Sequence, residues 1–267
     1  MAALFTVTAA LYVAAAALYL DFLGRGRERS AGAGAALLGL GAAFHFAFLL
    51  VEGLRGASPV GADIQQALSV ASWLVALGLL ATTRGKPRLR VLGAFVTPVT
   101  LLLFLGAGFR RGVAVVGEEM RSALLPVHVA ANVLGLVAFA LAFGVAVAYL
   151  VQERQLRRKQ LGALFQRLPP LDVLDALSFR LVATGFPMFT LGVVTGTVWA
   201  VQRDPSAPVI DATQTVGLLA WATFAMVLLL RVVVGFRGRR AAFGTALGFL
   251  GACAVLVGYV VRQDGGS

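Results

Sequence analysis

Residues 124–150 read LLPVHVAANVLGLVAFALAFGVAVAYL and contain no charged side chain. A helix needs about 20 apolar residues to cross the roughly 30 Å hydrocarbon core of a bilayer. A strand of a membrane barrel is about ten residues long and alternates in character. This stretch therefore predicts a transmembrane helix and sets the fold class for the rest of the chain.

The remainder of the chain has the same composition. Of its 267 residues, 59% are hydrophobic and 13% are charged, whereas a soluble domain is about half apolar and about a quarter charged. We expect an all-α, polytopic membrane helix bundle that forms a single integral membrane domain over residues 1–267. About eight spans are predicted, the third being the weakest because polar residues crowd its start; they lie near 4–23, 31–52, 64–82, 91–109, 124–150, 179–201, 212–235 and 241–261.

Lysine and arginine are distributed unequally between alternate loops. One set of loops, at 25–29, 84–90, 154–167 and 237–240, holds most of these cations. The other set holds Arg55, Arg110, Arg111, Arg121, Arg203 and Arg262. Because basic loops stay on the cytoplasmic side, we expect the first set to be cytoplasmic and both termini to face outside.

The net charge of +11 does not indicate nucleic-acid binding, because the cations lie in short loops and form no basic face with stacking aromatics. The single cysteine, Cys253, excludes an internal disulfide. The spans offer no nucleophile–base set and no acid pair, so we do not expect an enzyme. A transporter is disfavoured because few charges and no pair of broken helices interrupt the spans.

The loop 152–178 is long enough to carry structure. It begins QERQLRRKQ, and its later Leu and Val positions recur at roughly helical spacing. This pattern predicts a cytoplasmic amphipathic helix at the membrane interface, with a solvated linker as the alternative.

The chain has two histidines, His45 and His128. At 1.5 Å per residue, His45 lies about 9 Å and His128 about 6 Å below the outer boundary. Two imidazoles at one depth suit axial ligation of an iron porphyrin, and Asn132 lies one turn from His128, where it could bond the ring or a propionate. Phenylalanines surround His45, and Arg55, Arg121 and Arg203 are expected on the same outer side.

Other interpretations of the histidines stay open. A histidine in a span can bond a neighbouring helix or face a small water cavity, although intramembrane ionisable residues are functional candidates. Zinc is less favoured, because no acidic or thiolate cluster completes its coordination.

Three stretches carry a resemblance to a known family. They are HVAANVLGLVAFALAFGVAVAYLVQERQLRRK from residue 128, GFPMFTLGVVTGTVWA at 185–200 and LLAWATFAMVLLLRVVVGFRGRRAAFGTALGF at 218–249. They resemble the cytochrome c assembly family, which includes CcsA, CcmC, HemX and YpjD. The likeness is close over about 124–262, the family-like core, and only general before it.

The resemblance implies haem handling in a bacterial cytoplasmic (inner) membrane, with haem b as the expected cofactor. His128 matches the family's outer haem ligand, and Trp199 and Asp211 match the first and last residues of its tryptophan-rich WWD loop. We therefore expect cofactor binding at His45, His128, Asn132, Trp199 and Asp211, with His45 and His128 as iron ligands.

The chain also departs from the family pattern. The tryptophans between Trp199 and Asp211 are replaced by the stretch QRDPSAPVI at 202–210, a family histidine falls on Leu229, and another would fall beyond residue 267. The pattern is more similar to HemX- and YpjD-type members. The expected function is to hold or relay haem in the outer leaflet. The alternative is a membrane regulator or scaffold of glutamyl-tRNA reductase, a haem-synthesis enzyme, acting through the loop 152–178; other partners would be cytochrome c assembly proteins.

Overall fold

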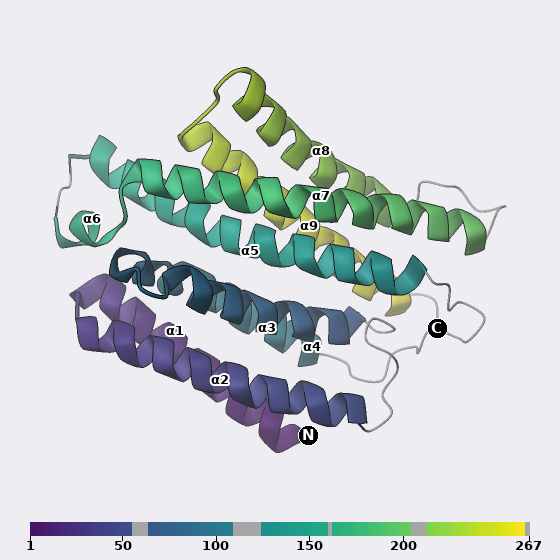
Figure 1. The fold of residues 1–267 in the computed structure, drawn as a ribbon, viewed down its shortest axis with the longest axis horizontal. Coiled ribbons are helices and arrows are strands. Elements are labelled where there is room, and N and C mark those ends of the chain that lie inside the picture. The colour runs from purple at the N-terminus through teal and green to yellow at the C-terminus, as the bar shows by residue number, and fades with distance from the viewer. Residues whose placement is uncertain (55–63, 109–123, 160–161, 204–211, 265–267) are drawn as a thin grey trace.

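Long helices run back and forth along one axis of the bundle (Figure 1). The computed structural model describes residues 1–54, 64–108, 124–159, 162–203 and 212–264, and those residues contain no β-strand. The helices are α1 (Ala2–Arg25), α2 (Glu28–Leu54), α3 (Ile64–Thr83), the 3₁₀ helix η1 (Pro87–Leu92), α4 (Gly93–Gly108), α5 (Leu124–Arg157), α6 (Ala163–Arg167), α7 (Leu171–Arg203), α8 (Ala212–Val233) and α9 (Arg239–Asp264).

The predicted all-α membrane bundle is confirmed. Within the described residues, six helical segments are long and apolar enough to cross a bilayer; they are α1, α2, α3, η1 with α4, α5 and α7. In α8 the apolar stretch is the shorter Gly217–Val233. The count of eight spans and the side on which the termini lie stay predictions.

Successive long helices alternate in direction, so the arginine-rich connections gather at one end of the bundle. The connections α1–α2, α3–α4, α5–α7 and α8–α9 all lie toward the left of Figure 1. We call this the basic end. Its composition is the asymmetry from which the sequence predicts a cytoplasmic face.

The segment 152–178 does not form one interfacial helix. Instead α5 continues to Arg157, α6 has five residues, and α7 begins at Leu171. The run QERQLR consists of strong helix formers, which explains why α5 extends past its apolar part. Pro169 and Pro170 end α6, because the residue before a proline avoids the helical region, and Leu168 is accordingly extended.

Arg167 of α6 caps the end of α1. Its guanidinium donates to the carbonyl oxygens of Leu23 at 2.8 Å and Gly24 at 2.7 Å. The last carbonyls of a helix have no partner within the helix, and Gly26, with φ of 71°, turns the chain away from them. A side chain on Gly26 would overlap the Arg167 guanidinium. The connection between α5 and α7 is thus fixed to the first helical hairpin.

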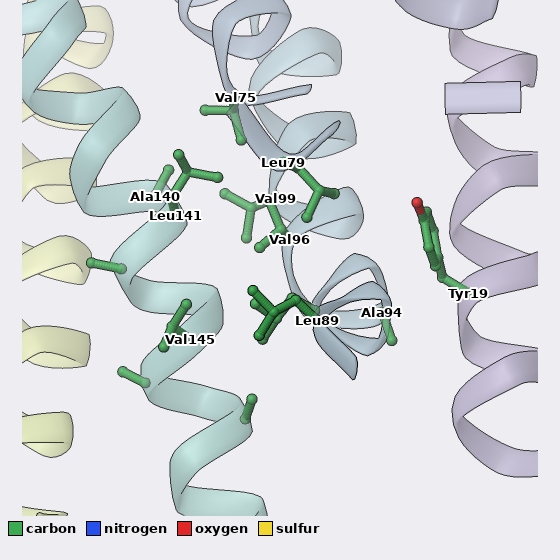
Figure 2. Close-up of a cluster of buried hydrophobic side chains, with 14 of the residues drawn as sticks. Tyr19, Val75, Leu79, Leu89, Ala94, Val96, Val99, Ala140, Leu141 and Val145 are labelled. Carbon is green, nitrogen blue, oxygen red and sulfur yellow. The ribbon is translucent and has the colours of Figure 1, made fainter. Parts of the chain in front are cut away.

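A layer of branched apolar side chains joins the helices α1–α4 to the rest of the bundle. Figure 2 shows Val75 of α3 and Val96 of α4 facing Leu141 and Val145 of α5. Val75, Val96 and Val145 are at most 2% exposed. Helix α3 packs against α2 on one side and α5 on the other, so it is the central contact between the two parts.

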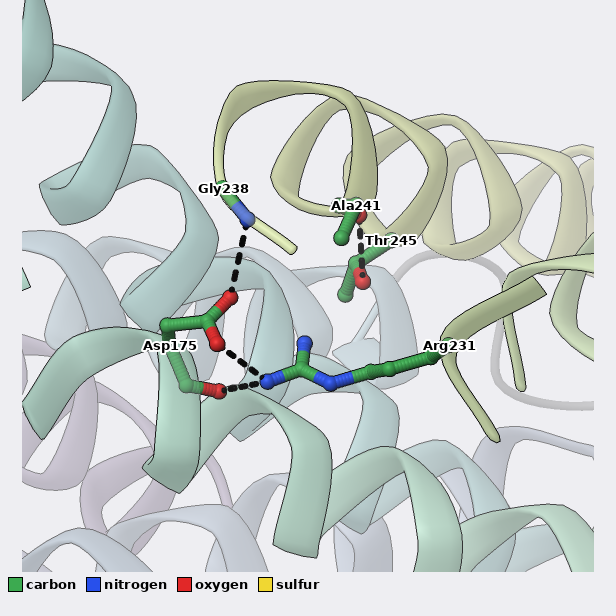
Figure 3. Close-up of polar contacts among 5 residues, drawn as sticks. All are labelled: Asp175, Arg231, Gly238, Ala241 and Thr245. Carbon is green, nitrogen blue, oxygen red and sulfur yellow. Dashed lines mark hydrogen bonds and ion pairs between the residues drawn. The ribbon is translucent and has the colours of Figure 1, made fainter. Parts of the chain in front are cut away.

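A buried ion pair lies at the basic end of the second part of the bundle, which comprises α5 to α9. Arg231 of α8 donates to both the carboxylate and the backbone carbonyl of Asp175 in α7, at 2.5 and 2.7 Å. The N–H of Gly238, in the turn before α9, donates to the other carboxylate oxygen at 3.2 Å (Figure 3). The two side chains are 8% and 15% exposed. Asp175 therefore joins α7, α8 and the start of α9.

Replacing Asp175→Asn should destabilise the bundle by about 3 kcal/mol, because removing one partner leaves a buried guanidinium uncompensated. The free energy of unfolding in detergent measures the change. Asp172→Asn, at an exposed position of the same helical turn, is the matched control and should change it by less than about 0.5 kcal/mol. Equal effects of the two substitutions would contradict the role given to Asp175.

Candidate cofactor site around His128

His128 lies in the second turn of α5 and points at a glycine face of α7. Gly192 and Gly196 are four residues apart and so share one face of that helix. A Cβ on Gly196 would lie 2.6 Å from Cε1 of His128, and one on Gly192 would lie 2.5 Å from Oδ1 of Asn132. Both contacts are too close for any side chain. The two glycines therefore provide the space that the imidazole and the amide occupy.

The backbone of α7 determines the tautomer of His128. Its Nδ1 is 2.8 Å from the carbonyl oxygen of Gly192. A carbonyl only accepts, so Nδ1 carries the proton and donates it. The lone pair of the neutral ring then lies on Nε2, as in metal-ligating histidines whose Nδ1–H bonds a backbone carbonyl.

Asn132 and Thr195 complete the surroundings of the ring. The Asn132 amide donates to the backbone carbonyl of His128 at 2.8 Å and lies 3.2 Å from Nδ1 and 3.3 Å from Nε2. The Thr195 hydroxyl donates to the carbonyl of Leu191 at 2.7 Å and contacts Nδ1 at 3.4 Å. Nε2 therefore has the weaker contact of the two ring nitrogens, and Asn132 keeps a shorter bond if it turns away.

His45 has a different environment. It is fully buried, with Nδ1 3.0 Å from the Tyr12 hydroxyl of α1 and Nε2 2.9 Å from the Ser69 hydroxyl of α3. The Phe104 ring of α4 packs edge-on at a centroid distance of 4.5 Å. Both ring nitrogens are engaged, so in this conformation His45 joins four helices and presents no free nitrogen to a ligand.

The structure does not bring the two histidines into one set of contacts. The hydrogen-bond partners of His45 lie in α1 and α3, and those of His128 lie in α5 and α7. Helix α3 lies between α2 and α5 (Figure 1). Ligation of one porphyrin by both rings would require His45 to give up one of its two hydrogen bonds and to leave its buried contacts between α1, α3 and α4, and it stays a prediction.

The other predicted site residues are placed only in part. Asn132 lies beside His128 as expected. Trp199 belongs to α7 but its side chain, like Asp211, lies outside the described residues. Within the described residues, no group of three or more His, Cys, Asp and Glu side chains could hold a metal ion. Sequence reasoning missed Gly192, Thr195 and Gly196, although the spacing GVVTG signals a close helix contact.

The fold and the site define a multi-pass membrane protein in which one helix orients an imidazole carried by its neighbour. Residues 61–263 match the family described as cytochrome C assembly protein, and the chain belongs to that family. The matched range includes both α5 and α7, which carry the candidate site.

Individual relatives match over a shorter stretch. The cytochrome c biogenesis protein CcsA of Synechococcus sp. (strain JA-2-3B'a(2-13)) is 39% identical over 88 residues, which are 33% of this chain and 25% of that protein. CcsA of Synechocystis sp. (strain ATCC 27184 / PCC 6803 / Kazusa) is 39% identical over 84 residues, 32% of this chain and 25% of that protein. The matches thus span about a quarter of these relatives. No solved structure matches the chain. The expected closeness to HemX- and YpjD-type members stays a prediction.

Replacing Gly196→Ala should destabilise the bundle by about 1–3 kcal/mol, since the added methyl overlaps the His128 ring. Gly217→Ala, in α8 with nothing within 4 Å of the added carbon, is the control and should be neutral or slightly stabilising. Thermal unfolding in detergent compares them. A Gly196→Ala protein as stable as the control would show that α5 and α7 are not in this close contact.

Proposed function

We propose that this chain is a non-catalytic haem-binding membrane protein of cytochrome c biogenesis, located in a bacterial cytoplasmic membrane, with His128 as the iron ligand. Membership of the cytochrome c assembly family and the CcsA names of its relatives support the haem-related role. The observation that carries the assignment to one residue is the hydrogen bond from Nδ1 of His128 to the Gly192 carbonyl.

The residues around His128 fit a haem ligand. Haem would supply an iron that takes an axial nitrogen, and haem b is the form expected for non-covalent holding. The Gly192 carbonyl holds the ring in the Nε2 lone-pair tautomer and increases the basicity of that nitrogen. Because Gly192 and Gly196 have no side chains, α7 leaves room for the His128 ring against its backbone. The Asn132 amide already bonds the His128 carbonyl at 2.8 Å and contacts both ring nitrogens only at 3.2 and 3.3 Å, so loss of its contact with Nε2 would leave that nitrogen for the metal without loss of the shorter bond.

Absorption spectra of the purified protein test this proposal. The wild-type protein should show a Soret band, as isolated or after addition of haemin. The His128→Ala protein should lose the band, and imidazole added to that variant should restore part of it by filling the vacated position. A wild-type protein that takes up no haemin would overturn the proposal.

The His45→Ala protein decides whether one or two histidines ligate iron. If His45 is a helix tie, this variant keeps the band and unfolds at a lower temperature, because the Tyr12 and Ser69 hydroxyls lose their buried partner. If the relay through two histidines is correct, a folded His45→Ala protein loses the band, as the His128→Ala protein does.

A second candidate function is regulation of a soluble haem-synthesis enzyme, glutamyl-tRNA reductase, through the basic end. It is favoured by the exposed cations Arg157, Arg158 and Lys159, where α5 ends beyond its apolar part. Arg158 and Lys159 are available to a soluble protein without any change in the bundle, and Arg157 is 67% exposed although it is paired with Glu153.

Replacing Arg157, Arg158 and Lys159 together by Gln should abolish co-purification of the reductase if this regulation occurs, since the contact would be electrostatic. The His128→Ala protein serves as the comparison and should still bind the enzyme. Loss of the enzyme only in the His128→Ala protein would instead tie the partnership to haem.

A further inference from the structure

A basic cleft lies at the end of the bundle where α5 ends and α9 begins. Its volume is about 480 Å³, and it is lined by Arg157 of α5 and by Arg239, Arg240 and Phe243 of α9. We call it the arginine cleft. Three guanidinium groups around one hollow attract an anion.

The arginines of this cleft are only partly neutralised. Glu153 forms an ion pair with Arg157 and lies 3.8 Å from the guanidinium of Arg239. Its side chain is 11% exposed, whereas those of Arg157 and Arg239 are more than 60% exposed. One carboxylate behind the cleft thus holds two arginines in place, and an excess of positive charge faces outward.

A larger cleft nearby is less suited to an anion. It has a volume of about 780 Å³ and lies between α7, α8 and the turn before α9. Asp172 and Asp175 are among its lining residues, and Asp175 already occupies Arg231. Its carboxylates oppose much of its positive charge, so the arginine cleft is the stronger candidate.

An exposed apolar stripe continues from the arginine cleft along α9. Phe243, Leu247 and Leu250 are 56%, 50% and 54% exposed, and Ala254 one turn further is also exposed. Their spacing of four, three and four residues places them on one helical face. The opposite face, with Phe249 and Ala252, is buried against the bundle.

We propose that the arginine cleft binds the phosphate of an anionic phospholipid, with an acyl chain lying along the Phe243–Leu247–Leu250 stripe. Charge and shape both select this ligand: the guanidinium groups match a phosphate, and the stripe matches a hydrocarbon chain that begins next to it. Clusters of basic residues at the cytoplasmic end of transmembrane helices bind anionic headgroups in this way. A free phosphate ion would use the arginines and leave the stripe uncovered.

Native mass spectrometry of the full-length protein in detergent tests the site. The protein is titrated with dioleoylphosphatidylglycerol or, in parallel, dioleoylphosphatidylcholine. The wild-type protein should retain phosphatidylglycerol at least about tenfold more strongly. The Arg239→Gln/Arg240→Gln protein should bind it about 25-fold more weakly, from roughly fivefold per basic residue near an anionic headgroup.

Matched variants separate the cleft from general charge and from folding. Arg27→Gln/Arg29→Gln removes the same charge from exposed positions of the same end and should leave binding unchanged. Arg240→Gln alone, about fivefold weaker, serves if the double variant does not elute as a folded protein. Equal retention of the two lipids, or equal loss in the cleft and control variants, would overturn the proposal. So would inorganic phosphate at millimolar concentration that fully displaces phosphatidylglycerol.

Discussion

The close approach of α5 and α7 is the contact on which the candidate site depends. In a bilayer, helices gain nothing from hiding apolar surface, so association depends on packing and on polar contacts between helices. Here Gly185, Gly192 and Gly196 of α7 receive Ala138, Asn132 and His128 of α5. The same face that lets the backbones approach also offers the Gly192 carbonyl to the imidazole. Packing and ligand orientation are therefore one feature of the structure.

The two parts of the bundle use their histidines in opposite ways. In the second part, one ring nitrogen of His128 is fixed and the other has only a weak partner. In the first part, both nitrogens of His45 are bonded at 3.0 Å or less. A donor or acceptor left without a partner in an apolar interior costs about 1–3 kcal/mol. The arrangement around His128 therefore suits ligand exchange, and the arrangement around His45 suits stability. Two imidazoles that the sequence predicts at the same depth are therefore not equivalent in their contacts.

The long helices could be predicted from the sequence because six of the apolar runs are long enough to cross a bilayer, and α5 was recognisable from its uncharged stretch alone. The structure of the segment 152–178 could not be predicted, because periodicity does not distinguish a separate amphipathic helix from the extended ends of α5 and α7. Pro169 and Pro170 separate α6 from α7. Asn132 could be placed by its spacing of four from His128. The Gly192 carbonyl and the bonds of His45 to Tyr12 and Ser69 depend on which helices become neighbours, which a single sequence does not state.

The contacts of His45 with Tyr12, Ser69 and Phe104 also affect how the first four helices are aligned along the bundle axis. Their facing surfaces consist mainly of Ala, Leu, Val and Phe, which fit one another almost equally well after a slide of one turn, about 5.4 Å. Such a slide would separate His45 from Tyr12, Ser69 and Phe104 together, because these three residues lie on three different helices. One imidazole thus helps to fix the axial register of α1, α2, α3 and α4 at the same time. The hydrogen bonds from Ser72 to the Thr100 carbonyl and from Trp73 to the Ala42 carbonyl act in the same sense on pairs of these helices.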